Sequence, residues 1–329
     1  MKMKTSTYIC YTKKEVVRKN SSSGGIFYEL AKYMIEQENA VVYGAGFDTD
    51  FSVVHMRAEN IEDMKKLMRS KYVQSDMADN FLRVKEDLMN GRQVLFVGTP
   101  CQVKGLHQFL NIANISAEQL TTVDFVCHGV PSPKVWKDYL HALSMKSQSG
   151  VKDVNFRDKR NGWHDYCMKI SFENKKEYVK SHYTDEYMFY YLRDYMMRDS
   201  CYQCHFRTAG NRASDITIAD AWTAEREPKK LDRGKSQVFV NTEKGEQLLQ
   251  NVTQYIYIYR SRTEEEREED IAQKADYQKK MEFKERFFKD YQKTGFSKEF
   301  RKKHYGGKNL MKNKIKHFLY QTGIGNKIK

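Results

Sequence analysis

The chain has 329 residues, of which 40% are hydrophobic and 13% aromatic, so it belongs with globular proteins rather than disordered ones. No run approaches the roughly 18 apolar residues of a membrane span, and the Lys-rich N-terminus carries no apolar signal segment, which predicts a cytoplasmic location. The net charge of +14 is concentrated in residues 291–329, which hold eleven Lys or Arg and one acidic residue. Because this charge is terminal and no nucleic-acid motif accompanies it, we expect no nucleic-acid partner.

Helix and strand patterns alternate in the first third of the chain. Residues 26–38 place apolar side chains at helical spacing, residues 40–47 form a valine-rich apolar run, and residues 61–68 return to the helical pattern. Residues 93–98 form a compact apolar run that ends in a tight turn, and a second such run covers residues 122–126. Each of these two runs predicts a buried strand.

Cys101 and Cys127 each follow one of these two strands directly. If the strands are parallel in one sheet, both cysteines emerge at its carboxyl edge, where open α/β sheets gather ligands. A further helix is expected to start near Ser132-Pro133. The order of the elements therefore brings the two cysteines together.

The sequence pattern after residue 150 changes twice, first to short strands and later to charged helices. Residues 151–179 show short strand-like patterns with turns, residues 185–198 a helical pattern, and residues 215–221 another apolar run. Charged helical sequence follows residue 260. We predict an α/β fold with a mixed, mainly parallel sheet flanked by helices, in which residues 1–260 form the main domain, about 151–182 an antiparallel insert, and 261–329 a basic helical tail.

A Cys-x-x-Cys pair, Cys201 and Cys204, adds two thiols to Cys101 and Cys127. Such a pair presents two thiolates from one loop, and the other two ligands of a metal site come from elsewhere in the fold. The spacing fits either an iron–sulfur cluster or a zinc site, the latter with His128 or His205 as further candidate ligands. Cys10 and Cys167 are predicted to be packed thiols.

Three segments combine residues suited to a phosphorylated, flat ligand. The run from Asn20 to Gly25 precedes a helix and offers backbone N–H groups, hydroxyls and the positive end of the helix dipole. The segment Ser70-Lys71-Tyr72-Val73-Gln74-Ser75 mixes cationic, aromatic and amide groups, and Gly98-Thr99-Pro100 is a narrow turn. Flexible turns and solvated loops have similar sequences, so the residues alone leave both interpretations open.

Several charged residues lie close to the cysteines in sequence. His128 is a candidate proton relay or an orienting group for the cysteine loop. Arg207 and Arg212 could offset the negative charge of thiolate ligands, or be solvated surface residues. Asp124 and Asp220 lie within apolar runs, where a structural hydrogen bond is the commoner role.

Six segments in order resemble the coenzyme F-420 (deazaflavin) hydrogenase/dehydrogenase beta subunits and their bacterial relatives. The resemblance spans most of residues 8 to 225. It is carried by Ser21-Ser22-Ser23-Gly24-Gly25-Ile26-Phe27, Ser70-Lys71-Tyr72-Val73-Gln74-Ser75, Gly98-Thr99-Pro100-Cys101-Gln102, Cys127-His128-Gly129-Val130-Pro131-Ser132-Pro133, Cys201-Tyr202-Gln203-Cys204 and Ser214-Asp215-Ile216-Thr217-Ile218-Ala219-Asp220.

The resemblance implies an α/β domain that binds FAD beside one 4Fe-4S cluster. By motif position, the cluster ligands would be Cys101, Cys127, Cys201 and Cys204. His128, the candidate proton relay named above from its place beside Cys127, is the candidate catalytic residue. The flavin site would be lined by Ser21, Ser22, Ser23, Gly24, Gly25, Lys71, Tyr72, Gln74, Ser75, Gly98, Thr99 and Pro100.

The resemblance has two departures. The close cysteine repeats of the N-terminal ferredoxin module of many relatives do not occur in these residues, so electrons would arrive from a partner protein or a small carrier. Ala221-Trp222-Thr223 stands where relatives tend to have Phe-Trp-Gly. The resemblance therefore does not identify the organic substrate of this chain, which stays unknown. Such relatives are associated with bacterial surface-polysaccharide synthesis, which the resemblance implies here.

Two further hypotheses come from the residues. A zinc-stabilised, non-catalytic binding or scaffold protein would use the same cysteines without flavin. In the tail, residues 309–320 alternate apolar and Lys residues, a pattern that fits peripheral contact with an anionic membrane or with a partner protein.

Overall fold

The computed structural model describes residues 6–206, 212–225, 227–228, 231–262 and 277–322. Eight strands form one large sheet. They are β1 (Thr7–Thr12), β2 (Val41–Phe47), β3 (Val53–Ala58), β4 (Val94–Val97), β5 (Leu120–Phe125), β9 (Ile216–Asp220), β10 (Ser236–Val240) and β11 (Ile256–Arg262).

These strands lie in the order β11-β1-β10-β9-β5-β4-β2-β3. The four strands β9, β5, β4 and β2 at the centre run parallel, and antiparallel strands extend the sheet at both edges. The predicted α/β class with a mixed sheet is confirmed. The antiparallel strands β1, β3, β10 and β11 were not predicted.

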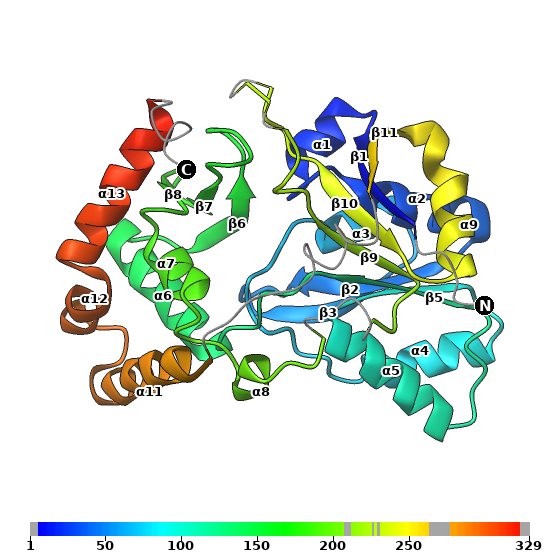
Figure 1. Ribbon diagram of the computed structural model, residues 1–329. Coiled ribbons are helices and arrows are strands. Elements are labelled where there is room, and N and C mark those ends of the chain that lie inside the picture. The colour runs from blue at the N-terminus through cyan, green and yellow to red at the C-terminus, as the bar shows by residue number, and fades with distance from the viewer. Residues whose placement is uncertain (1–5, 207–211, 226, 229–230, 263–276, 323–329) are drawn as a thin grey trace.

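Helices cover both faces of the large sheet (Figure 1). Val42 and Leu95 point to one face and share a core with the helices α2 (Ile26–Glu38), α3 (Ile61–Leu67) and α9 (Glu243–Val252). Tyr43 and Phe96, the next residues along, pack on the other face against α4 (Asn80–Met89) and α5 (Pro100–Ile112). The strands are continuous apolar runs because both faces are buried. Two short helices complete this half, α1 (Glu15–Asn20) and the 3-10 turn η2 (Thr253–Tyr255).

The predicted insert is a separate three-stranded antiparallel sheet. Its strands are β6 (Val151–Asp158), β7 (Cys167–Phe172) and β8 (Glu177–Ser181). On the side of the molecule away from the large sheet, it lies with the helices α6 (Pro133–Ser147), α7 (Glu186–Leu192), α11 (Tyr277–Thr294), α12 (Lys298–Tyr305) and α13 (Lys308–Gln321) (Figure 1). None of the described helices is long and apolar enough to cross a bilayer.

An aromatic core joins the predicted tail to the insert. Trp136, Phe156 and Tyr190 are fully buried in the same cluster as Phe287 and Phe300 of the tail helices. Large aromatic side chains dominate the energy of such cores. The described helices after residue 276 therefore complete the core beneath the small sheet.

The helix expected over residues 185–198 ends earlier than predicted. Helix α7 stops at Leu192, and Asp194 adopts a left-handed φ of 61°, a conformation that an aspartate tolerates but that ends a helix. A separate short helix α8 (Asp199–Tyr202) carries Cys201, and Cys204 follows it. This break turns the Cys-x-x-Cys pair back toward the large sheet.

Candidate functional site

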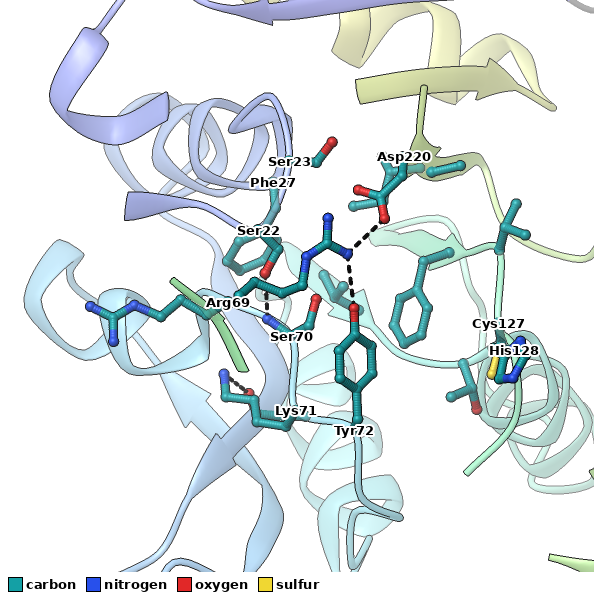
Figure 2. A pocket seen from close by; sticks show the side chains of 18 of the residues that line it. Ser22, Ser23, Phe27, Arg69, Ser70, Lys71, Tyr72, Cys127, His128 and Asp220 are labelled. Carbon is teal, nitrogen blue, oxygen red and sulfur yellow. Dashed lines mark hydrogen bonds and ion pairs between the residues drawn. The ribbon is translucent and has the colours of Figure 1, made fainter. Parts of the chain in front are cut away.

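A cavity of about 630 Å³ opens between the carboxyl edge of the large sheet and the small sheet (Figure 2). This volume is typical of a site for a small molecule or cofactor. Most predicted site residues line it together, namely Ser21, Ser22, Ser23, Gly25, Lys71, Tyr72, Ser75, Gly98, Thr99, Cys127 and His128. Gly24, Gln74 and Pro100 do not line it, and neither do Cys101, Cys201 and Cys204.

The Ser–Gly turn before α2 depends on its two glycines. Gly25 has a φ of 88°, and a side chain there would come within 2.7 Å of the Thr12 methyl group. A side chain on Gly24 would come within 2.7 Å of the Cys10 carbonyl oxygen, so this residue serves the packing of the turn on β1. The turn thus holds the N-terminus of α2 at the cavity.

A hydrogen bond connects two of the predicted segments. The backbone N–H of Ser70 donates to Ser22 Oγ at 2.7 Å (Figure 2). On the far side, Gln102 Nε2 donates to Ser75 Oγ at 2.9 Å, while Gln102 Oε1 accepts from the Thr99 N–H at 2.9 Å. The three segments therefore form one continuous polar rim.

Lys71 has a structural role that the sequence did not indicate. Its ammonium donates to the carbonyl oxygens of Ala45 at 2.8 Å, Lys66 at 3.1 Å and Met68 at 2.6 Å, and burial lowers its pKa to about 7. An ammonium has three N–H donors, and all three are in use. Lys71 therefore anchors the Ser70–Tyr72 loop to β2.

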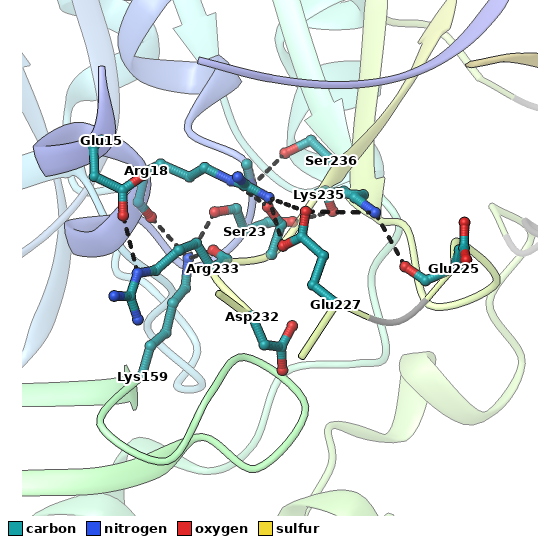
Figure 3. Close-up of polar contacts among 12 residues, drawn as sticks. Glu15, Arg18, Ser23, Lys159, Glu225, Glu227, Asp232, Arg233, Lys235 and Ser236 are labelled. Atoms are coloured by element: carbon teal, nitrogen blue, oxygen red, sulfur yellow. Dashed lines mark hydrogen bonds and ion pairs between the residues drawn. The ribbon is translucent and has the colours of Figure 1, made fainter. Parts of the chain in front are cut away.

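The loop between β6 and β7 clamps the Ser–Gly turn from outside (Figure 3). The Lys159 ammonium donates to the carbonyl oxygens of Arg18 at 2.9 Å, Ser23 at 2.7 Å and Arg233 at 2.5 Å. Trp163 Nε1 donates to the Ser22 carbonyl oxygen at 3.1 Å. These hydrogen bonds therefore connect the insert directly to the turn.

An aromatic and charged wall on the cavity was not predicted from the sequence. Tyr166 from the insert, Tyr191 from α7 and Trp222 after β9 line it, and Tyr72 stacks on Tyr191 at 4.5 Å. Arg157 of β6 also lines the cavity. Trp222 belongs to the Ala221-Trp222-Thr223 segment noted in the sequence. No motif marks Arg157, Tyr166 or Tyr191, because they reach the site only through the packing of the small sheet and its helices on the large sheet.

The four predicted cluster cysteines lie near one another, and Cys127 is the member that lines the cavity. Burial, and to a smaller extent the neighbouring Cys201, Cys101 and Cys204, raise the pKa of the Cys127 thiol to about 12. The Val130 N–H donates to Cys201 Sγ at 3.5 Å, and Thr99 Oγ1 lies 3.1 Å from Cys101 Sγ. Across the described ranges, no three Cys, His, Asp or Glu side chains surround a single point as one metal ion requires.

His128 lies beside Cys127 at the cavity wall. Its Nε2 lies 2.8 Å from Asp194 Oδ1, and Lys280 forms an ion pair with the same carboxylate. The imidazole edge packs against Tyr191 with ring centroids 5.1 Å apart. The Asp194 carboxylate thus fixes the orientation of the His128 ring.

Burial and ion pairing show the roles of the remaining cysteines and of Arg212. Cys10 and Cys167 are 0% and 1% exposed, which confirms that they are packed thiols. Arg212 Nη1 lies 3.2 Å from Asp124 Oδ2, so the buried Arg212 charge neutralises that carboxylate rather than standing free for a cluster. Arg207 lies outside the described residues.

Two comparisons with known proteins place this chain, and a search of curated proteins matches nothing. A chain in the xenon-derivatised F420-reducing nickel–iron hydrogenase complex of Methanosarcina barkeri is 15% identical, with a TM-score of 0.52 over 89% of this chain and 92% of that one, a likeness that shows the fold. The family model for the C-terminal region of the coenzyme F420 hydrogenase/dehydrogenase beta subunits matches residues 91–266, more than half of the chain. The chain therefore belongs to the family of coenzyme F420 hydrogenase/dehydrogenase beta subunits.

Proposed function

We propose that this chain is an oxidoreductase that passes electrons between a 4Fe-4S cluster, FAD and an organic substrate. The observation that carries the proposal is that Cys127, which lines a cofactor-sized cavity, lies near the other three predicted thiols. Family membership supports redox chemistry in general. We also propose that the redox centres are a 4Fe-4S cluster and FAD, and that the reaction serves surface-polysaccharide synthesis.

The donor set fits an iron–sulfur cluster. Cys101, Cys127, Cys201 and Cys204 would be its ligands, and a cluster would supply single-electron transfer while FAD supplies two-electron chemistry. In such a cluster each thiolate binds a different iron atom, so the sulfur atoms need not surround one point. Ligation would also remove the thiol proton that burial holds on Cys127.

The cavity residues provide binding and orientation. The Ser–Gly turn offers hydroxyls and the N-terminus of the 13-residue helix α2 to a phosphate. Tyr72, Tyr191 and Trp222 offer flat apolar faces for a ring system. His128, oriented by Asp194 through Nε2, would be the group that takes up or returns a proton beside the bound ligand.

Anaerobic purification followed by visible spectroscopy and assays of iron, sulfide, zinc and flavin tests the proposal. We expect about four irons and four sulfides with one FAD per chain. Cys127→Ser should lose iron, whereas Cys167→Ala, which removes a packed thiol elsewhere, should keep it. A colourless protein that contains zinc and binds no flavin would establish the scaffold hypothesis instead.

The partners are proposed on separate grounds. The similar hydrogenase chain belongs to a complex, which is consistent with a redox partner protein or carrier here. We also propose peripheral membrane contact through α13, where Met311, Ile315 and Phe318 are 61%, 52% and 63% exposed at helical spacing among lysines.

Sedimentation with anionic vesicles tests the membrane contact. Ile315→Glu combined with Phe318→Glu should abolish co-sedimentation, and Ile112→Glu, at a residue 81% exposed on α5, should not. Equal sedimentation of all three proteins would refute the contact. If the wild-type protein does not sediment with vesicles but self-associates, the exposed face of α13 binds protein instead of a membrane.

A further inference from the structure

Arg157 presents a fixed positive charge to the cavity from the small sheet. It is 3% exposed, and its Nη1 donates to Tyr72 Oη and to Asp220 Oδ2, both at 2.9 Å. Its guanidinium carbon lies 4.1 Å from the centre of the Tyr166 ring. The guanidinium is therefore held in place by three neighbours.

The charge on Arg157 persists although burial opposes it. Burial lowers its pKa, but Asp220, Tyr72 and Tyr166 outweigh that cost and the pKa lies above the ordinary arginine value. Because little solvent reaches this side chain, water and salt screen its charge far less than they screen a surface charge. The guanidinium is thus a lasting source of positive potential at the cavity wall.

Part of the guanidinium is unused by the protein. Among the described residues, Nε and Nη2 of Arg157 are buried and have no hydrogen-bond partner. These two nitrogens form one edge of the guanidinium, the edge that can donate to two neighbouring acceptor atoms. Both nitrogens are also closed to solvent, so Arg157 acts on the cavity through its charge rather than through a further hydrogen bond.

We propose that Arg157 and Asp220 form an electrostatic pair that sets how strongly the cavity favours the reduced, anionic form of a bound flavin ring over the oxidised form. This inference rests on the proposed function, because it requires a flavin in the cavity. Arg157 favours added negative charge, and Asp220 opposes it. Both act as positioning charges rather than as catalytic residues.

The charge balance explains why the pair matters. A flavin ring that takes up two electrons and one proton gains one negative charge, whereas two electrons and two protons leave it neutral. That negative charge is shared over the nitrogen and carbonyl of the pyrimidine edge, which is a two-acceptor edge. A nearby fixed cation stabilises the anionic form and so raises the affinity for reduced flavin relative to oxidised flavin.

Removing either member of the pair should have opposite effects. Arg157→Met leaves Asp220 as an uncompensated carboxylate, and should lower the affinity ratio of reduced to oxidised flavin at least tenfold. Asp220→Asn leaves Arg157 uncompensated, and should raise the ratio by a similar factor. For a two-electron couple, tenfold corresponds to a shift of about 30 mV in the reduction potential.

Anaerobic reductive titration of bound FAD measures this ratio without any substrate. Arg157→Lys keeps the charge, and should stay within about threefold of wild type. Arg83→Met is the matched control, because Arg83 forms the same kind of pair with Asp79 on the surface, where both side chains are more than half exposed. Its ratio should not change.

The outcomes separate this inference from the proposed function. If wild type binds FAD but the Arg157 and Asp220 variants shift in the same direction or not at all, the electrostatic pair is refuted and the flavoprotein assignment stands. If wild type binds no flavin, the proposed function itself fails. Should Arg157→Met not fold, the sign of the Asp220→Asn shift together with the Arg157→Lys result decides.

Discussion

Replacing Lys159 by methionine tests whether the small sheet holds the cavity in shape. The substitution keeps the length and apolar stem of the side chain, but leaves the carbonyl oxygens of Arg18, Ser23 and Arg233 without their shared donor. A buried polar group without a partner costs about 1–3 kcal/mol. Burial lowers the pKa of Lys159 well below its ordinary value, so removing the cation recovers part of that cost.

We therefore expect Lys159→Met to lower the free energy of unfolding by about 2–4 kcal/mol in urea denaturation. It should also weaken FAD binding, because the Ser23 carbonyl belongs to the turn that faces the cavity. Lys152→Met, at an exposed position of the preceding strand β6, should change stability by less than about 0.5 kcal/mol. If Lys159→Met matched this control in both assays, the clamp would be irrelevant to the cavity.

Two further predictions concern the turn and the helical half. Gly25→Ala adds a methyl group at a φ of 88° beside Thr12, so it should lower the free energy of unfolding by about 2–3 kcal/mol and weaken FAD binding. The control Gly91→Ala, at a φ of 72° with open space around it, should lower that free energy by only about 1 kcal/mol and leave FAD binding intact. Burial raises the pKa of Glu186 to about 7, so the folded state binds the extra proton between about pH 4.5 and 7 and wild type loses stability as pH rises through that window. The free energy of unfolding of Glu186→Gln should not fall in this window, so relative to wild type it should rise by about 2–3 kcal/mol between pH 4.5 and 7.5. Parallel curves of unfolding free energy against pH for the two proteins would contradict the raised pKa of Glu186.

The sequence predicted the parallel centre of the large sheet well. Residues 93–98 and 122–126 are short apolar runs bounded by turn residues, and the structure has β4 and β5 there. Because parallel neighbours share a carboxyl edge, the meeting of Cys101 and Cys127 followed from the pattern alone. The antiparallel strands β1 and β11 were missed because their polar and tyrosine-rich sequences lack a clear alternation.

The site was predicted in part, for a different reason in each case. The Ser–Gly turn has a local signal, since a helix start needs capping groups and Gly25 needs a left-handed φ. Lys71 was assigned to the ligand from its residue type, and only the fold shows that its three donors meet backbone carbonyl oxygens. Arg157 carries no local signal, because its neighbours Tyr72 and Asp220 are 85 and 63 residues away in sequence.

The relative placement of the two sheets therefore determines the cavity. Cys101 and Cys127 follow strands of the large sheet, whereas Arg157 and Lys159 come from the small one and reach across to it. A change at Lys159 should alter the cavity wall while the cysteines keep their positions. Lys159→Met should consequently lose flavin affinity but retain its iron content, and a parallel loss of both would mean that the small sheet supports the cysteine end as well.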